Sequence, residues 1–266
     1  MTQVGHEFLF AGTWASMATA SADALTRVEK FSMTDADGKT DIAAEQLAAT
    51  VLPALAAQRL LADFAKLEAG DVIVLNGAKS ALGQCLLQLA AEKGLVTIAI
   101  EREHSAWEET VAHWGNLNPA NIAASELFTQ TADFAKVLAD VPAPKLGIDT
   151  EGGRSGLVVA QTVGEGATVV SVGNASGHPL PLTADVLLNK SVHVTGFSLG
   201  KWLAGAKKAD VEAAVADIVG KTAQGKLNTR VAWEPFKDFS IALKRAQDFQ
   251  ELPIVVVMDP APERLQ

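Results

Sequence analysis

The stretch that decides the fold runs from residue 71 to residue 84 and reads DVIVLNGAKSALGQ. Its first part, residues 71–76, is apolar, contains several β-branched residues and is too short for a helix, which is typical of a strand buried on both faces. Gly77 and Gly83 follow in a loop of small residues, and an apolar helical pattern continues from Gln84. We therefore predict a strand, a tight turn and a helix.

The same alternation of strand and helix continues along the chain. Strands are predicted at Val96–Ile100, Asn121–Ala124, Lys145–Asp149, Thr168–Val172 and Val192–Phe197. Helical patterns lie between them at Ser80–Lys93, Ser105–Trp114, Glu126–Ala139, Arg154–Val163 and Ala184–Asn189. Continuous apolar strands that alternate with helices predict an α/β fold with a doubly wound, Rossmann-like parallel sheet of about six strands.

The flanking segments predict smaller elements around this sheet. Asp41–Leu67 has helical spacing that Pro53 interrupts, so we expect two consecutive helices there. Further helices are expected at Ala209–Gln224 and Pro235–Gln250, before the apolar segment Ile254–Met258. We expect a rudimentary N-terminal domain over 1–50, a dinucleotide-binding domain over 51–230 and a returning C-terminal helix and strand over 231–266.

Composition excludes several classes of protein. The 266 residues are 48% hydrophobic and 20% charged, as expected of a folded protein with a sizeable core. The formal charge of −9 repels phosphate backbones and anionic membranes, so nucleic acid is not an expected partner. The apolar run Ala48–Ala62 contains Arg59 and is too short to span a bilayer. Cys85 is the only cysteine and the five histidines are scattered, so we predict no metal site.

The loop Gly77–Gly83 is a candidate phosphate-binding loop. Small residues between a strand and a helix allow the backbone to approach a pyrophosphate, which the helix start stabilises. The strict GxGxxG pattern is absent, so a tight turn without a ligand is the alternative. Glu101, 18 positions after Gly83, favours NAD, whereas Arg102 favours NADP. An ordinary solvated charge cluster at the end of a strand would have the same residues. The residues alone therefore do not decide between NAD, NADP and no nucleotide.

Several blocks in order make the chain similar to a known family. They are Gly12–Trp14, Arg59–Phe64, Gly70-Asp71, Asn76–Gln84, Gly94–Ile98, Gly152–Ser155, Gly166–Gly173 and Gly196–Trp202. Together they resemble the medium-chain dehydrogenase/reductase superfamily, and within it the zinc-independent enoyl thioester reductases of mitochondrial fatty acid synthesis.

The resemblance implies an NADP(H) site. It places Asn76, Gly77, Ser80, Gly83 and Gln84 around the pyrophosphate, Arg102 and His104 at the 2′-phosphate, and Gly173, Phe197 and Leu199 beside the nicotinamide. The sequence departs from the family pattern at Lys79–Ala81, at His104, where an Arg is usual, and at Ser198, where an aromatic residue is usual. We expect these departures to weaken or abolish NADP(H) binding.

The resemblance also bears on activity. The family begins with a GroES-like catalytic domain that carries a Tyr proton donor, and the matching blocks here start near the end of that domain. The sequence contains no Tyr, and we assign no catalytic residue. The first hypothesis is a degenerate, non-catalytic accessory subunit of a larger assembly, mitochondrial by resemblance. The alternative is an active NADPH-dependent enoyl thioester reductase.

Apolar segments near the two ends of the chain predict contacts with each other or with another protein chain. In the family, the segments that match Phe8–Trp14 and Ile254–Met258 pair within the catalytic domain. We therefore expect them to lie against each other or against another protein chain, because a bare apolar edge strand promotes association. The expected partners are protein chains, in a larger complex or a homo-oligomer.

Overall fold

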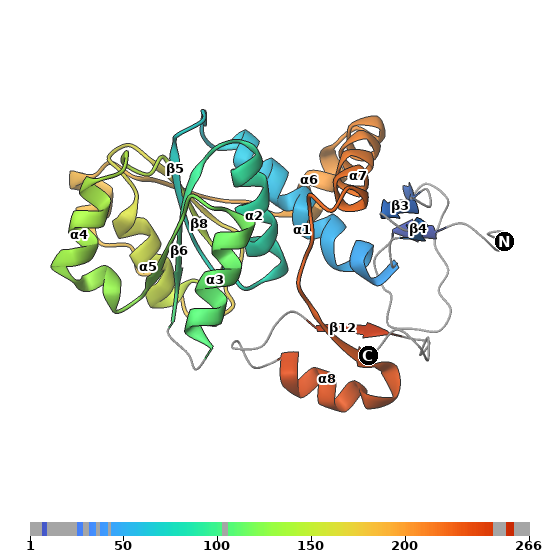
Figure 1. Cartoon of the computed structure of the whole chain (residues 1–266). Helices are drawn as coiled ribbons and strands as arrows, with labels where there is room; N and C mark the ends of the chain where they lie inside the picture. The colour runs from blue at the N-terminus through green and yellow to red at the C-terminus, as the bar shows by residue number, and fades with distance from the viewer. Residues whose placement is uncertain are drawn as a thin grey trace. The chain divides into compact units, whose positions relative to one another are not determined.

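The computed structural model describes residues 7–9, 26–28, 32–35, 38–41, 44–102, 106–246 and 254–257. The chain forms two compact units (Figure 1). One comprises Ala56–Trp202, and the other comprises Met1–Leu55 together with Leu203–Gln266.

The unit Ala56–Trp202 is built on a six-stranded sheet. Its strands are β5 (Val72–Asn76), β6 (Val96–Glu101), β7 (Asn121–Ser125), β8 (Leu146–Asp149), β9 (Thr168–Ser171) and β10 (His193–Gly196). Every pairing is parallel, in the spatial order β10-β9-β8-β5-β6-β7. Numbered from β5, this is the order 3-2-1-4-5-6 of the doubly wound dinucleotide-binding fold. The predicted fold class is confirmed.

Successive strands from β5 to β9 are connected by the helices α2 (Ala81–Glu92), α3 (Trp107–Leu117), α4 (Ala132–Ala139) and α5 (Gly153–Thr162). The helix α1 (Ala44–Asp63) precedes β5, and β10 is followed by α6 (Leu199–Gly205), α7 (Lys208–Ala223) and α8 (Phe239–Ala246). Short 3-10 turns lie at Phe128–Gln130 and Phe236–Asp238, and a π-helical turn lies at Asp185–Asn189.

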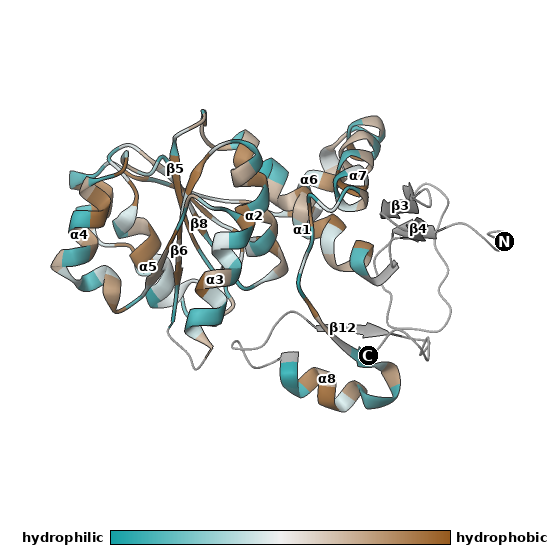
Figure 2. Cartoon of the chain, viewed as in Figure 1, coloured by the Kyte–Doolittle hydropathy of each residue, from teal (hydrophilic) through white to brown (hydrophobic). Residues whose placement is uncertain are grey.

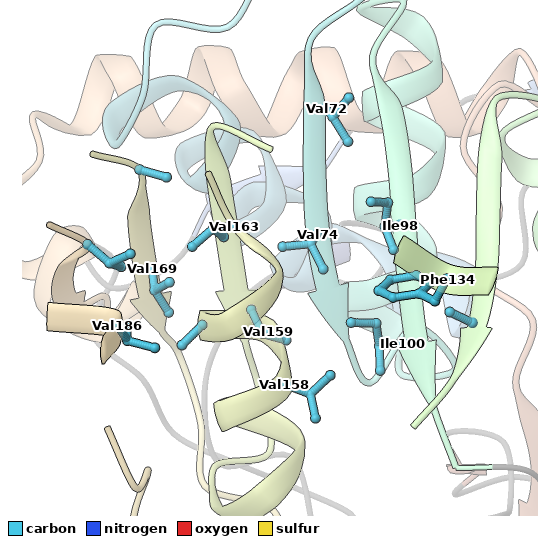
Figure 3. Packing of buried hydrophobic residues seen from close by; sticks show 14 residues of the cluster. Val72, Val74, Ile98, Ile100, Phe134, Val158, Val159, Val163, Val169 and Val186 are labelled. Carbon is cyan, nitrogen blue, oxygen red and sulfur yellow. The ribbon is translucent and has the colours of Figure 1, made fainter. Parts of the chain in front are cut away.

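Apolar side chains fill both faces of the sheet, since successive residues of a strand point to opposite sides. On one face Val74 and Ile100 pack in a cluster with Phe134 of α4 and Val159 of α5 (Figure 3). On the other face α2 contacts β6 and α3 contacts β7. The hydrophobic colour runs along β5 and β6 in Figure 2. Burial on both faces explains why these strands read as continuous apolar runs.

The second unit contains three small two-stranded sheets. β1 (Glu7–Leu9) pairs with β2 (Thr26–Val28), and β3 (Ser32–Asp35) pairs with β4 (Gly38–Asp41), both antiparallel. β11 (Ala232–Pro235) pairs in parallel with β12 (Ile254–Val257). Within the described strands β12 is partnered by β11 and β1 by β2, so Glu7–Leu9 and Ile254–Val257 do not pair with each other. The alternative, that these segments lie against another protein chain, stays a prediction. Residues 10–14 and Met258 lie outside the described residues.

Four helix predictions are corrected by the structure. α1 is one helix that contains Pro53, because Val51, Ala54 and Leu55 are fully buried on either side of it and this packing outweighs the lost hydrogen bond. The predicted helix Glu126–Ala139 is broken at Thr131, whose hydroxyl donates to Phe128 O and accepts from Phe134 N.

The other two corrections concern short segments. The helix expected over 235–250 consists of a 3-10 turn followed by α8, which the structure describes only as far as Ala246. The segment Ala184–Asn189 contains the π-helical turn Asp185–Asn189 rather than an α-helix.

Candidate nucleotide-binding site

The candidate site lies at the carboxyl end of the parallel sheet, where β5 leads into α2. β5 lies between β6 and β8, and the strand order reverses between β5 and β8. In open parallel sheets ligands bind outside the carboxyl ends of the strands at such a reversal. The predicted phosphate loop therefore lies at the point of the fold where a ligand is expected.

Two glycines shape the loop. Gly77 has a φ of +62°, and a Cβ there would lie 2.2 Å from Oγ1 of Thr150, the residue that follows β8. A Cβ at Gly83 would lie 2.4 Å from the Gly77 carbonyl oxygen, so α2 starts in direct contact with the loop backbone. Gly77 must be glycine because of its positive φ and because Thr150 approaches it closely. Gly83 must be glycine because of the close approach alone.

Ser80 caps the start of α2. Its hydroxyl donates to the Gly77 carbonyl at 2.7 Å and accepts from the Gly83 amide at 3.0 Å. The first amides of a helix have no intrahelical acceptor. The Ser80 hydroxyl already accepts the hydrogen bond of the Gly83 amide. Among the described first-turn amides, those of Ala81 and Leu82 therefore remain to donate to an anion. The positive end of the helix dipole adds to their attraction.

Asn76 and Gln84 support this loop from within the protein. Asn76 is fully buried, donates to Asp149 Oδ1 at 2.8 Å and to Ser155 Oγ at 3.2 Å, and accepts from the Thr150 amide at 2.7 Å. Gln84 is also buried and donates to the Lys79 carbonyl at 2.9 Å. In the structure Asn76 ties the ends of β5 and β8 together, and Gln84 braces the loop.

Of the other predicted site residues, those that the structure describes follow the carboxyl ends of β6, β9 and β10. Arg102 follows β6 and is exposed, whereas His104 lies outside the described residues. Gly173 follows β9, and a Cβ there would lie 2.6 Å from the Thr150 carbonyl oxygen. Phe197 follows β10 and packs edge-on against Phe64 at 5.8 Å between ring centroids. Leu199 is the first residue of α6.

Two carboxyl groups flank the loop. Glu101 ends β6 and is 8% exposed, and burial together with the nearby Glu151 raises its pKa to about 7. Glu151 follows β8, and its Oε1 lies 3.8 Å from the position of a Cβ at Gly77. Burial also raises the pKa of Glu151. Sequence reasoning singled out Glu101 but missed Glu151, whose position just after a predicted strand could have identified it.

The fold and the loop together define the class of protein: a Rossmann-like domain with a candidate dinucleotide site. No protein-family model matches the chain. It is 30% identical over 239 residues to the mitochondrial enoyl-acyl-carrier-protein reductase of Dictyostelium discoideum. That alignment covers 89% of this chain and 64% of the relative, so the chain spans less than two thirds of the relative's length.

Solved structures of enoyl thioester reductases have the same fold as this chain. A variant of Etr1p in complex with NADP and crotonyl-CoA superposes with a TM-score of 0.81 at 19% identity, over 92% of this chain and 72% of that chain. The mitochondrial 2-enoyl thioester reductase Etr1p/Etr2p heterodimer from Candida tropicalis gives 0.81 at 19% identity, over 93% and 72%. The predicted resemblance is confirmed: the chain is similar in sequence to mitochondrial enoyl-acyl-carrier-protein reductases and similar in fold to Etr1p.

Two further observations concern the described part of the chain. None of its helices combines the length and the apolar character that crossing a membrane requires. Within the same ranges, no three His, Cys, Asp or Glu side chains are grouped so that they could hold a metal ion.

Proposed function

We propose that this chain provides the NADP(H)-binding domain of an enoyl-thioester-reductase-like protein, and that residues 1–266 alone are not a catalyst. The observation that carries the binding proposal is the contact between Gly83 and the Gly77 carbonyl beneath the start of α2. This contact brings the helix start to the carboxyl end of β5, where a pyrophosphate could accept hydrogen bonds from the first-turn amides.

Groups on the loop and beside it would contact a bound nucleotide. Ala81 and Leu82 would supply amides to the pyrophosphate, and Arg102 would face a 2′-phosphate. Gly173, Phe197 and Leu199 would lie toward the nicotinamide side, as the family resemblance implies. When bound, the nicotinamide would supply a hydride to an acceptor.

Catalysis needs more than a bound nucleotide. Reduction of an enoyl thioester requires a positioned acid that protonates the substrate after hydride transfer. In the related family this acid is a Tyr, and the sequence contains none. We therefore propose binding without reduction for residues 1–266.

A titration tests the proposal. Tryptophan fluorescence of the purified chain is followed as NADPH or NADH is added, and the same sample is assayed for reduction of crotonyl-CoA. We expect saturable binding with a dissociation constant between about 1 μM and 1 mM, the range of ordinary enzyme sites. We expect no reduction of crotonyl-CoA. No fluorescence change with either nucleotide up to millimolar concentration would reject binding. Reduction at an ordinary enzymatic rate would instead establish the active reductase.

Arg102 provides a prediction about nucleotide choice. Arg102→Ala should weaken NADPH binding about tenfold, because a charge-assisted contact with the 2′-phosphate is lost. NADH lacks that phosphate, so its affinity should change less than about twofold. Arg230→Ala, another exposed arginine and one outside this unit, serves as the control. Equal losses of NADPH and NADH affinity in Arg102→Ala would contradict the assignment.

We also propose that the chain works in an assembly of protein chains, in mitochondria as the names of its relatives suggest. Two observations favour an assembly. β10 is an edge strand whose four residues are all exposed, and nearby Leu188 is 76% exposed. Exposed edge strands and apolar residues promote pairing with another chain. Size-exclusion chromatography with light scattering should give a mass above 27.8 kDa, and a well-behaved monomer would contradict the proposal.

A further inference from the structure

Two carboxyl groups border the loop that would hold the nucleotide phosphates. Glu101 is nearly buried at the end of β6, on one side of β5, and Glu151 extends from the end of β8 on the other side to within 3.8 Å of a Cβ position on Gly77. An anionic pyrophosphate on this loop would therefore lie close to two acidic groups. Like charges at such separations repel strongly where solvent is partly excluded.

The surrounding charges do not neutralise this pair. Among the described residues, Glu151, Lys79 and Arg102 act electrostatically on Glu101. Glu151 is influenced by Arg102, Glu126 and Asp149, and it has a hydrogen bond with Ser155. In the described part of this sheet edge, four carboxyl groups from the ends of β6, β7 and β8 thus interact with two cations, Lys79 and Arg102.

Asp149 is the carboxyl group of the four that hydrogen bonds inside the protein hold in place. Asp149 is fully buried, and its Oδ2 has no hydrogen-bond partner in the described structure. Its Oδ1 accepts from the Asn76 side chain and from the amides of Glu151 and Gly152. Burial raises the pKa of Glu101 and of Glu151, which makes these two carboxyl groups the candidates for a change of charge when a ligand approaches.

We propose that Glu101, coupled to Glu151, makes nucleotide binding depend on the uptake of one proton from solvent. This inference rests on the proposed nucleotide site and adds a regulatory property to it. The neutral Glu101 carboxyl removes a negative charge beside the phosphates and gains an O–H donor. The ionised carboxylate can accept a hydrogen bond from a ribose hydroxyl, but it repels the phosphates of the nucleotide.

The pH dependence of binding follows from linkage. Burial raises the pKa of Glu101 to about 7, so the group is mostly neutral at pH 6 and mostly ionised at pH 8. If only the neutral form binds well, the dissociation constant should rise about tenfold between these two pH values. The complex formed at pH 8 should take up close to one proton for each nucleotide bound.

Isothermal titration calorimetry of the full chain tests this with NADP⁺ and NAD⁺. Measurements at pH 6 and pH 8, in buffers of different ionisation enthalpy, give affinity and proton uptake together. NAD⁺ is essential because the 2′-phosphate of NADP⁺ titrates near pH 6 by itself, whereas NAD⁺ carries no phosphate monoester. We expect both nucleotides to bind more weakly at pH 8.

Variants identify the group responsible. Glu101→Gln should bind at pH 8 about as tightly as the wild type at pH 6, with less than a twofold difference between the two pH values. Glu151→Gln should reduce the difference by removing the neighbouring charge. Glu165→Gln is the control, because Glu165 lies in the exposed turn before β9, at the opposite end of the sheet, and should leave the tenfold difference unchanged.

The possible outcomes separate this inference from the proposed function. Tight NAD⁺ binding that does not change with pH would overturn the proton coupling and leave the nucleotide site standing. A pH effect that persists in Glu101→Gln would also overturn it. No binding of either nucleotide at pH 6 would overturn both proposals. Circular dichroism of each variant confirms that a loss of binding is not a loss of fold.

Discussion

Gly83→Ala is expected to destabilise the unit Ala56–Trp202 by about 3 kcal/mol, the upper end of the range for overpacking, and to abolish nucleotide binding. A methyl group at this position would lie 2.4 Å from the Gly77 carbonyl oxygen and 2.5 Å from the Ala78 Cα. Because both atoms belong to the backbone, no flexible side chain can move aside. The start of α2 must shift away from the loop, which separates the amides that would bind a phosphate.

Urea unfolding measures the change in the free energy of unfolding, and the fluorescence titration measures binding. Gly115→Ala is a matched control, since Gly115 lies in α3 and a Cβ there has no heavy atom within 4 Å. This control should leave binding unchanged and stabilise the protein by about 0.5–1 kcal/mol, because alanine favours a helix. A Gly83→Ala protein as stable as the wild type would show that the close contact is not needed.

Asn76→Ala is the second change with a large expected effect, a loss of about 3 kcal/mol of stability. Its amide bridges Asp149, Ser155 and Thr150 across the ends of β5, β8 and α5. Truncation leaves the Thr150 amide without this acceptor and removes one of the donors to the buried Asp149 carboxylate. Unsatisfied buried polar groups are more costly than the average hydrogen bond is favourable.

Thermal and urea unfolding measure this effect, with Asn189→Ala as the control. Asn189 also donates its side-chain amide to an aspartate, Asp185, at 2.7 Å, but in an exposed turn. Its loss should change the free energy of unfolding by less than about 0.5 kcal/mol. Equal effects of the two substitutions would mean that the Asn76 network contributes little to stability.

The sheet could be predicted from the sequence because its strands carry a strong local pattern. Residues 72–75 are apolar at every position because both faces of the strand are covered, and the alternation of such runs with helices predicts a parallel sheet. The helix errors have local causes that propensity does not resolve. Pro53 stays within α1 because its neighbours are buried, and the Thr131 hydroxyl starts a new helix.

The candidate site could be predicted only in part. Gly77, Ser80 and Gly83 are close in sequence, so the loop that they form follows from the local pattern. The role of Asn76 depends on partners 73 to 79 residues further along the chain, which no local pattern indicates. Glu151 comes just after a predicted strand and could have been singled out on that ground, but its approach to Gly77 results from the order of β5 and β8 in the sheet.

The central claim is that this chain binds a dinucleotide over the loop between β5 and α2. A crystal structure of residues 1–266 grown with NADP⁺ at pH 6 tests it most directly. We expect a pyrophosphate within hydrogen-bond distance of the Ala81 and Leu82 amides and a 2′-phosphate beside Arg102. A well-defined structure in which this loop holds no nucleotide, or in which the nucleotide lies away from the carboxyl end of β5, would contradict it.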